Sequence, residues 1–268
     1  MPAAMGVSFI GGRRGMRLCE GARKAVRTFG AALAVCLGLG AIVGAAEKRR
    51  GKIGWIDGHK PYGIYERSFK RALDFGLSLF GMSILWPVMA VTAALVKIKL
   101  GSPVIFKQKR PGLGAEPFEL RKFRTMLEGD GPDRERLTGF GKRLRATSLD
   151  ELPELWNILK GEMSIVGPRP LLCGYIPYYN ECERHRHDVK PGLTGYAQVN
   201  GRNLVDWEER FAMDIAYANK ITFANDFQII LSTLGKVFKR EGVTSGTSAT
   251  MEGFMEYCEG VGRMPVEK

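Results

Sequence analysis

Two adjacent acids, Asp150 and Glu151, are the residues of this chain whose types and spacing point most directly to chemistry. Ser148 and Glu151 fit the S-x-x-E capping box, and apolar residues then recur at helical spacing at Leu152, Leu155, Trp156 and Leu159. The pattern predicts both acids in or just before the first turn of a helix. The positive end of the helix dipole favours an ionised carboxylate there. Such a carboxylate is suited to act as a nucleophile or to bind a hard cation.

The start of this predicted helix has two alternatives. With Ser148 as N-cap, Pro153 lies just past the first turn, whereas with Asp150 as N-cap the missing N–H of Pro153 is harmless. An acid pair before an apolar run is also typical of an ordinary helix start without chemistry. The neighbouring motifs therefore decide how the pair is interpreted.

Three cations are candidates for binding phosphate beside the acids. Arg169 lies between two prolines in Gly167-Pro-Arg-Pro170, which restricts its backbone and favours bidentate contact with a phosphate. Arg145 precedes Asp150 by five residues, and lipid headgroups are its alternative partners. Lys122 lies at the end of a predicted strand. An exposed lysine that protects a strand edge from aggregation is there an equally ordinary alternative to phosphate binding.

Alternating side chains on both sides of a glycine-rich turn predict a small β-hairpin. Val104, Phe106 and Gln108 alternate before the turn, and Phe118, Leu120 and Lys122 alternate after it. Further along, Pro191–Gly195 and Asn200–Asn203 predict turns that present Gln198 and Arg202, either for pyrophosphate binding or as plain turn chemistry.

The apolar segment from Phe75 to Val96 has no charged residue and is long enough to cross a bilayer. Pro87, preceded by Trp86, lies near its middle, where the proline frees backbone groups and kinks a helix. Lysine or arginine flanks both ends, which favours both ends on the cytoplasmic side. The segment therefore predicts a re-entrant helix over residues 70–99, with a buried core helix as the alternative.

A shorter apolar segment, residues 31–46, is rich in alanine and glycine and has basic flanks like a secretory signal. We expect residues 1–60 to be an extension, and a weak anchor, a cleaved segment and an unused start codon are its alternatives. At the other end, Phe227, Ile230, Leu231, Leu234, Val237 and Phe238 predict an amphipathic helix that caps the core or lies in the membrane interface. Residues 244–268 are expected to form a tail.

A net charge of +12 and a pI near 9.6 indicate an anionic partner. The cations are spread beside apolar runs instead of forming one stripe, which favours a membrane surface and phosphates over nucleic acid. Five cysteines at unrelated spacings indicate neither a disulfide framework nor a zinc site. His185 and His187, among arginines, are expected to be solvated or lipid-facing, and Tyr175–Tyr179 is expected in an interfacial belt.

Several motifs in one order resemble the bacterial sugar transferases known as monotopic phosphoglycosyl transferases. They lie at residues 107–113 (KQKRPGL), 121–126 (RKFRTM), 147–171 (TSLDELPELWNILKGEMSIVGPRPL) and 189–203 (VKPGLTGYAQVNGRN). The resemblance covers residues 65–243. It implies an α+β, mainly helical, monotopic membrane protein with a proline-broken re-entrant helix, a small β-hairpin and amphipathic interfacial helices. Residues 100–243 would be the cytoplasmic catalytic part. Many members carry serine where this chain has Trp86, which affects the expected geometry of the break.

The resemblance also implies an activity, in which a sugar 1-phosphate moves from a UDP-sugar to polyprenyl (undecaprenyl) phosphate with release of UMP. In the family, the aspartate matching Asp150 forms a covalent phosphosugar intermediate and the glutamate matching Glu151 helps hold Mg²⁺, with Asp150 as a further ligand. Asp214 matches another acid of the family. The implied place is the cytoplasmic face of the bacterial inner membrane. The chain's length and its Gly-Val-Thr ending resemble members that use N-acetylated amino sugars.

The main alternative is a basic membrane-surface scaffold of polysaccharide assembly without turnover, in which Asp150 and Glu151 only cap a helix. A nucleic-acid binder driven by net charge is a third hypothesis, and it would show steeply salt-sensitive retention on DNA. Neither explains why an acid pair, a proline-flanked arginine and a proline-broken apolar segment occur in one chain. Oligomeric state and the sugar carried by the donor are not encoded in these patterns.

Overall fold

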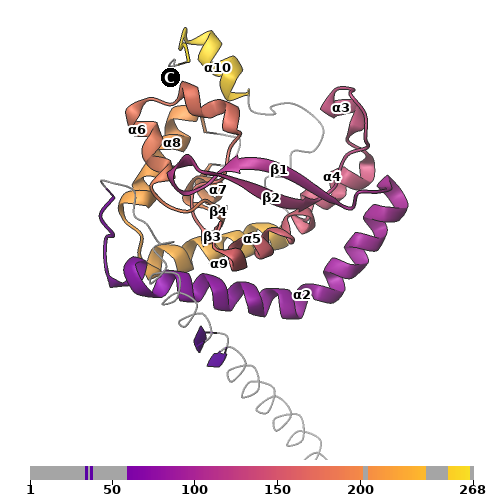
Figure 1. The fold of residues 1–268 in the computed structure, drawn as a ribbon, viewed down its shortest axis with the longest axis horizontal. Coiled ribbons are helices and arrows are strands. Elements are labelled where there is room, and N and C mark those ends of the chain that lie inside the picture. The colour runs from indigo at the N-terminus through magenta and orange to yellow at the C-terminus, as the bar shows by residue number, and fades with distance from the viewer. Residues whose placement is uncertain (1–33, 36, 39–58, 202–204, 240–252, 266–268) are drawn as a thin grey trace, which may run out of the picture.

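The computed structural model describes residues 34–35, 37–38, 59–201, 205–239 and 253–265. Within them the fold is mainly helical, with one long apolar helix and two small sheets (Figure 1). The strands are β1 (Ile105–Pro111), β2 (Pro117–Phe123), β3 (Ser164–Val166) and β4 (Gly192–Thr194). The α-helices are α2 (Lys70–Leu100), α3 (Asp133–Arg136), α4 (Gly139–Ala146), α5 (Glu154–Lys160), α6 (Glu181–Arg184), α7 (Tyr196–Asn200), α8 (Trp207–Asn219), α9 (Phe223–Lys239) and α10 (Phe254–Gly260). Shorter helical turns are η1 (Tyr65–Phe69), η2 (Leu113–Ala115), η3 (Leu149–Glu151), η4 (Cys173–Tyr178) and η5 (His185–His187).

The long apolar helix α2 confirms the predicted apolar segment. The stretch Tyr65–Leu100 has 36 residues, and its most apolar 18-residue window has a mean hydropathy of 2.0 and is 11% buried, so by length and composition it is able to cross a membrane. α2 stays one helix through Pro87 and bends along its course in Figure 1. Trp86 is 63% exposed beside the proline. The re-entrant course in a bilayer stays a prediction, and the structure shows a single bent helix.

Charged residues at the start of α2 tie this helix to the rest of the fold. The Lys70 ammonium donates to Asp226 Oδ2 at 2.6 Å, and Arg71 donates to the carbonyl oxygen of Ile158 at 2.7 Å. One turn later, Asp74 Oδ1 accepts from the backbone N–H of Ile165 at 3.0 Å. The beginning of α2 is thus fixed to α9, α5 and β3, which sets its direction relative to the rest of the chain.

The hairpin predicted from alternation is confirmed. β1 and β2 are antiparallel, with Phe106 opposite Lys122 and Gln108 opposite Leu120. Gly114 makes the turn with a positive φ of 66°, a conformation that glycine adopts without strain. Leu120 packs against Leu155 and other buried side chains of α5, so the hairpin lies across the helix that follows the acid pair (Figure 1).

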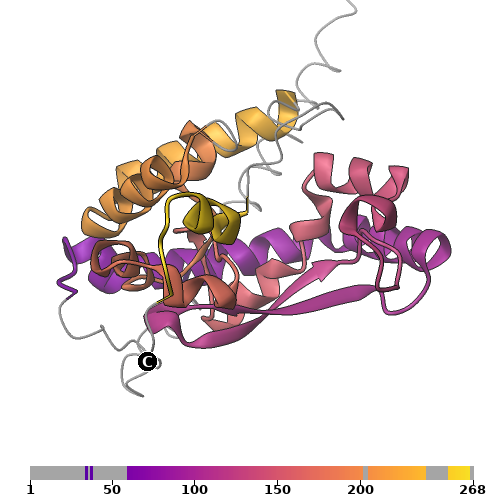
Figure 2. The same cartoon turned by 90° about the horizontal axis from the view of Figure 1, so that it is seen from above.

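The second sheet is a short parallel pair, in which β3 lies beside β4. Its backbone approach needs glycine, since a Cβ on Gly192 would lie 2.1 Å from the N atom of Gly167. α8 and α9 pack their apolar residues against β3. One face of α9 enters this core through Ile229, whereas Phe227 and Leu231 are about half exposed, so the predicted amphipathic helix is confirmed. Figure 2 shows α9 and the β1–β2 hairpin on opposite sides of α2.

Aromatic residues form a separate core, and this core overturns one expectation. Tyr179 is 1% exposed and packs against Phe211 and Phe254, so Tyr175–Tyr179 does not form an exposed interfacial belt. The expectation was wrong because helix α10, from the range expected to be a tail, packs Phe254 against both of these rings. The short segment 31–46 lies almost entirely outside the described residues.

Candidate functional site

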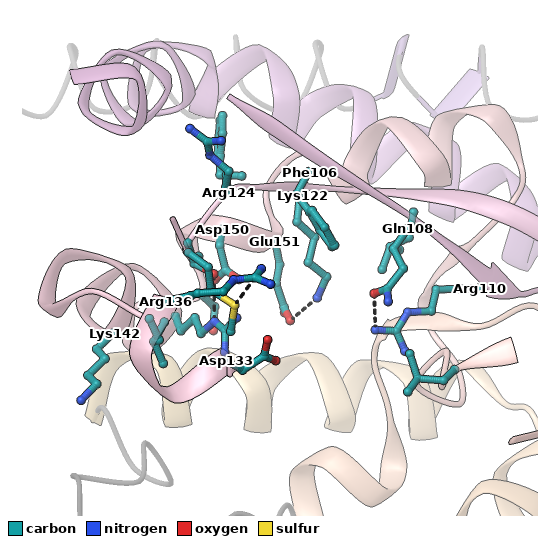
Figure 3. Close-up of a pocket in the computed structure, with 18 of the residues that line it drawn as sticks. Phe106, Gln108, Arg110, Lys122, Arg124, Asp133, Arg136, Lys142, Asp150 and Glu151 are labelled. Atoms are coloured by element: carbon teal, nitrogen blue, oxygen red, sulfur yellow. Dashed lines mark hydrogen bonds and ion pairs between the residues drawn. The ribbon is translucent and has the colours of Figure 1, made fainter. Parts of the chain in front are cut away.

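Five of the predicted acids and cations line one cavity of about 1310 Å³ (Figure 3). Its walls come from the β1–β2 hairpin, from the turn that carries the acids and from the loop that follows β3. The lining includes Lys122, Arg145, Asp150, Glu151 and Arg169. Residues distant in sequence are brought together because the hairpin lies across α5 and because Arg169, in the loop after β3, pairs with Glu151 of the acid turn.

The turn before α5 differs from both predicted registers. Ser148 has a left-handed backbone with φ of 54° and its side chain caps nothing. Asp150 and Glu151 then lie in the short 3-10 turn η3, and α5 begins at Glu154 with Pro153 as its N-cap. The S-x-x-E capping box was therefore a wrong prediction. The proline explains the difference, since Pro153 has no N–H to donate and the backbone hydrogen bonds of the acid turn therefore do not continue into α5.

Glu151 is the most strongly paired acid of the site. Its Oε1 accepts from Arg169 Nη2 at 2.7 Å and from the Lys122 ammonium at 3.0 Å. Burial alone would raise the pKa of this carboxyl, but the two cations outweigh it and lower the pKa of Glu151 to about 2. Glu151 is therefore ionised at neutral pH, and it fixes the arginine and the lysine on one side of the cavity.

Asp150 has a different environment from its neighbour. It is 7% exposed, and burial raises the pKa of its carboxyl to about 6, with the charge of Glu151 adding to the rise. Lys122 and Arg145 act in the opposite direction without overcoming the burial. The sequence led us to expect a carboxylate that is easily ionised, and for Asp150 that expectation was wrong. The helix dipole does not offset burial here, because α5 begins four residues later.

Glu154 does not line the cavity, but it pairs with a cavity lysine and was not predicted from the sequence. Its Oε1 lies 3.0 Å from the Lys122 ammonium, so this lysine bridges Glu151 and Glu154. Burial raises the pKa of Glu154 to about 7. Its four-residue spacing from Asp150 was the available signal, but that spacing is equally typical of a helix surface.

Arg145 lies at the cavity as expected, because α4 places it beside the base of the hairpin. Its Nε donates to Thr125 Oγ1 at 3.0 Å, and its charge acts on Asp150. Arg202 lies outside the described residues. Gln198 lies in α7 and donates to the carbonyl oxygen of Leu193.

Asp214 is the predicted site residue that does not line the cavity. It is 3% exposed in α8 and pairs with the equally buried Arg186 at 2.7 Å. Arg186 Nη2 also donates to the backbone carbonyl oxygen of Arg169 at 2.8 Å. The pair therefore holds the backbone of Arg169 in place through the hydrogen bond from Arg186.

The histidine segment was also misread from the sequence. Arg186 is 2% exposed and His187 is 7% exposed, so this part of the chain is neither solvated nor lipid-facing, although His185 is exposed. Burial lowers the pKa of His187 to about 3, which keeps it neutral. The arginine-rich pattern gave the opposite impression because the buried acid that pairs with Arg186 lies 28 residues further along the chain.

The oxygen ligands at the cavity suit a hard divalent cation. Asp150 and Glu151 supply two neighbouring carboxylates, and Mg²⁺ is typically held by one or two carboxylates together with substrate phosphates. Within the described ranges no cluster of three or more His, Cys, Asp or Glu residues forms a closed metal cage. The residues fit a cation that shares its coordination with a phosphorylated substrate.

The fold and the cavity together define a class: an acid pair among cations, suited to phosphorylated substrates, in a chain with one long apolar helix. Residues 65–240 match the family described as bacterial sugar transferase. The chain is 46% identical over 191 residues to the "Uncharacterized sugar transferase EpsL" of Bacillus subtilis (strain 168), which covers 69% of this chain and 95% of that protein. The chain belongs to the bacterial sugar transferase family.

Other relatives have more specific names. A "UDP-glucose:undecaprenyl-phosphate glucose-1-phosphate transferase" of Xanthomonas campestris pv. campestris is 39% identical over 185 residues, covering 63% of this chain and 38% of that protein. A protein of the same name from Caulobacter vibrioides is 37% identical over 181 residues, covering 62% of this chain and 68% of that protein. The chain thus spans less than half of the Xanthomonas relative and most of the Caulobacter relative.

Proposed function

We propose that this chain is a phosphoglycosyl transferase. It moves a sugar 1-phosphate from a UDP-sugar to polyprenyl (undecaprenyl) phosphate and releases UMP, as the first membrane step of glycoconjugate or exopolysaccharide synthesis. The observation that carries the proposal is the buried Asp150 beside Glu151, which Lys122 and Arg169 hold in place. The names of the Xanthomonas and Caulobacter relatives support the same substrates.

The first half of the reaction uses Asp150 as nucleophile. One carboxylate oxygen of Asp150 forms a bond to the sugar-proximal phosphorus of the donor, and the bond from that phosphorus to the bridging oxygen breaks. UMP leaves with the bridging oxygen and its electron pair. The enzyme is left with the sugar phosphate bonded to Asp150 as an acyl phosphate.

The second half returns the carboxylate. An oxygen of the polyprenyl phosphate forms a bond to the same phosphorus, and the bond between phosphorus and Asp150 breaks. The product is a polyprenyl diphosphate sugar, and Asp150 is again a free carboxylate. An acyl phosphate, which is a mixed anhydride, suits this exchange because the attacking lipid phosphate and the leaving carboxylate are both weak bases.

Cations make an attack by one anion on another feasible. Arg145 and Arg169 are placed to neutralise the charge that gathers on the phosphate oxygens, and Lys122 keeps Glu151 ionised beside them. Mg²⁺, when bound by Glu151 and Asp150, would add positive charge at the donor diphosphate. The neighbouring acids thus differ in role, with Asp150 as nucleophile and Glu151 as metal ligand and anchor for the cations.

The lipid acceptor requires the cavity to lie close to a bilayer, and α2 supplies the means. Its exposed apolar residues, among them Trp86, Val91 and Ile98, are suited to lie among acyl chains. Because both ends of the helix are basic, we infer that α2 enters and leaves the same leaflet. The cavity would then face the cytoplasm at the bacterial inner membrane, where it meets both substrates.

The decisive experiment is mass spectrometry of the detergent-solubilised chain after incubation with a panel of UDP-sugars and Mg²⁺, without lipid acceptor. We expect one donor to add the mass of its sugar phosphate to the peptide that contains Asp150. Asp150→Asn should abolish the adduct. Asp133→Asn, the same acid-to-amide change at an exposed position of the same cavity, should retain it.

The same panel identifies the sugar, and an N-acetylated amino sugar is the expected one. An adduct on Asp150→Asn, or wild-type turnover by that variant with donor and acceptor, would overturn the covalent mechanism. A chain that turns over no donor at all, while membrane binding and polysaccharide assembly persist in Asp150→Asn, would favour the non-catalytic scaffold.

A further inference from the structure

One end of the cavity contains a side-chain pair to which the proposed reaction gives no role. Gln108 and Arg110 project from β1 at positions of the same strand face. In Figure 3 they lie on the opposite side from Arg136 and Lys142, with Glu151 and Lys122 between the two groups. A long substrate could therefore contact cations on both sides of the acid pair.

The partners of Arg110 are all uncharged. Its Nη2 donates to Gln108 Oε1 at 2.7 Å, and its Nη1 reaches the carbonyl oxygen of Pro170 at 3.5 Å. Its Nε is buried without a hydrogen-bond partner. Among the described residues no carboxylate lies within ion-pair distance of this guanidinium. Arg110 thus differs from Arg169, whose charge is compensated by Glu151 at 2.7 Å.

The positive charge of Arg169 acts on this guanidinium, which no carboxylate among the described residues pairs with directly. Burial lowers the pKa of Arg110, and the charge of Arg169 lowers it further. Two neighbouring guanidinium groups repel each other, and an anion between them removes the repulsion. The nearby carboxylates of Glu151 and Glu154 are paired with Lys122 and Arg169, so an anion supplied by a ligand would add direct compensation at this end.

The geometry points to a phosphate as that anion. A guanidinium has a planar set of donors that matches two phosphate oxygens, and Gln108 already restricts the orientation of this one. We propose that Arg110, oriented by Gln108, binds a phosphate group of one of the two substrates and thereby positions it in the cavity. This inference rests on the proposed function and extends it to a second anion subsite.

Either substrate supplies the required chemistry, because the donor carries a diphosphate and the acceptor a phosphate monoester. The two are separated by equilibrium binding to the full detergent-solubilised chain, with UDP as the donor probe and farnesyl phosphate as the acceptor probe. Binding is measured by titration calorimetry without turnover. Arg110→Gln removes the positive charge and the planar set of N–H donors. Arg110→Lys keeps the positive charge but loses the planar set of N–H donors.

The matched control is Lys109→Gln, because Lys109 is the next residue of β1, is exposed, and does not line the cavity. It removes the same charge from the same strand. We expect Arg110→Gln to weaken one probe by about 10-fold to 100-fold, as loss of a charge-assisted hydrogen bond does. Arg110→Lys should fall between this variant and wild type, and Lys109→Gln should bind both probes as wild type does.

Weakened UDP binding assigns the subsite to the donor, and weakened farnesyl phosphate binding assigns it to the lipid. The proposal is overturned if Arg110→Gln and Arg110→Lys bind both probes as tightly as wild type, or if Lys109→Gln weakens them equally. Thermal unfolding without ligand checks that each variant is folded. If Arg110→Gln does not fold, the binding constants of Arg110→Lys decide the test. A wild-type chain that binds neither probe would overturn the proposed function itself.

Discussion

Three carboxyl groups within five residues of one another differ in charge state because their cations are shared unequally. Glu151 has both Lys122 and Arg169 within 3.0 Å, and the pKa of its carboxyl falls to about 2. Glu154 shares only the lysine, and the pKa of Asp150 is governed by burial. A buried carboxyl group whose charge is only partly balanced by cations is costly to ionise. Its carboxylate form is therefore more basic and more ready to bond to an electrophile.

The pH dependence of the first half-reaction follows from Asp150. Its pKa of about 6 lies above the ordinary value, so the carboxyl is neutral and unreactive below pH 6 and ionised above it. We expect kcat/KM for the UDP-sugar to rise about tenfold per pH unit below pH 6 and to level off above it, since kcat/KM reports groups of the free enzyme. The measurement is UMP release over the pH range 4.5 to 8.

Glu154 provides the control for that profile, because the pKa of its carboxyl is also raised, to about 7. Glu154→Gln removes this group and should keep the inflection near pH 6. If the inflection disappears in Glu154→Gln, the titrating group is Glu154 and the assignment to Asp150 is wrong.

Lys122 should be the cation whose loss costs most, because it bridges two acids. Lys122→Met leaves Glu151 and Glu154 with less compensation and removes a positive charge from the cavity. We expect UMP release without acceptor to slow by about 10²-fold or more, in line with loss of one preorganised charge at a reacting centre. Lys107→Met, which removes an exposed lysine of β1 paired with Glu119, should leave the rate unchanged. Equal slowing in both variants would contradict a specific role.

The sequence predicted which residues form the site better than it predicted the protonation states of those residues. Asp150, Glu151 and Arg169 occur in motifs whose residue types already indicate phosphate chemistry, and the structure places them together. The pKa of Asp150 and the participation of Glu154 were not predictable, since both depend on burial beside a hairpin that begins over forty residues earlier.

Individual elements position the arginines, and the loop that carries Arg169 shows how. Two prolines limit its backbone, but the loop is held from behind by Arg186, which donates to the Arg169 carbonyl oxygen at 2.8 Å. Asp214 of α8 pairs with Arg186, and both side chains are at most 3% exposed. A buried pair of this kind contributes little net stability but fixes geometry.

Removing one member of the pair should therefore be costly. Asp214→Asn leaves Arg186 as a buried, uncompensated charge, and we expect a loss of about 3 to 5 kcal/mol in the free energy of unfolding. The measurement is urea unfolding in detergent. Glu119→Gln is the matched acid-to-amide change at an exposed pair, and it should leave the free energy of unfolding almost unchanged because solvent screens the pair. Similar costs for the two variants would mean that the buried pair is not structurally important.

Elements with local signals were predictable and those that depend on distant partners were not. The β1–β2 hairpin followed from alternation, and α9 from the spacing of its apolar residues. By contrast, α10 follows a stretch of small and polar residues typical of a tail. It packs because Phe254 and Cys258 are buried against the aromatic rings of α8 and η4, and Arg263 just beyond it pairs with Glu183. The 3-10 turn η3 was mistaken for a helix start because Ser148 adopts a left-handed backbone, which a capping motif does not anticipate.

The whole molecule separates an apolar part from a charged one. Large apolar residues in the second half of α2 are exposed, namely Ile84, Trp86, Val88, Val91, Leu95 and Ile98. α9 adds Phe227, Leu231 and Leu234, each about half exposed. Tyr65 contacts Phe223 edge-to-face at 5.7 Å, so the exposed stripe of α9 begins beside the start of α2. Apolar surface of this extent on a basic chain favours a membrane with anionic lipids over water.

A single charge on this surface should release the chain from lipid. Val91 is 60% exposed on α2, and Val91→Lys places an ammonium where acyl chains are expected, at a cost of about 2.5 to 3.5 kcal/mol, which corresponds to about a hundredfold weaker partitioning. The measurement is flotation of the purified chain with vesicles of anionic phospholipid. Val261→Lys, at a site that is 56% exposed beyond α10, is the same substitution away from α2 and should float as wild type does. If both variants float equally, the apolar face of α2 does not contact the bilayer, and the cavity has to reach its lipid substrate by another surface.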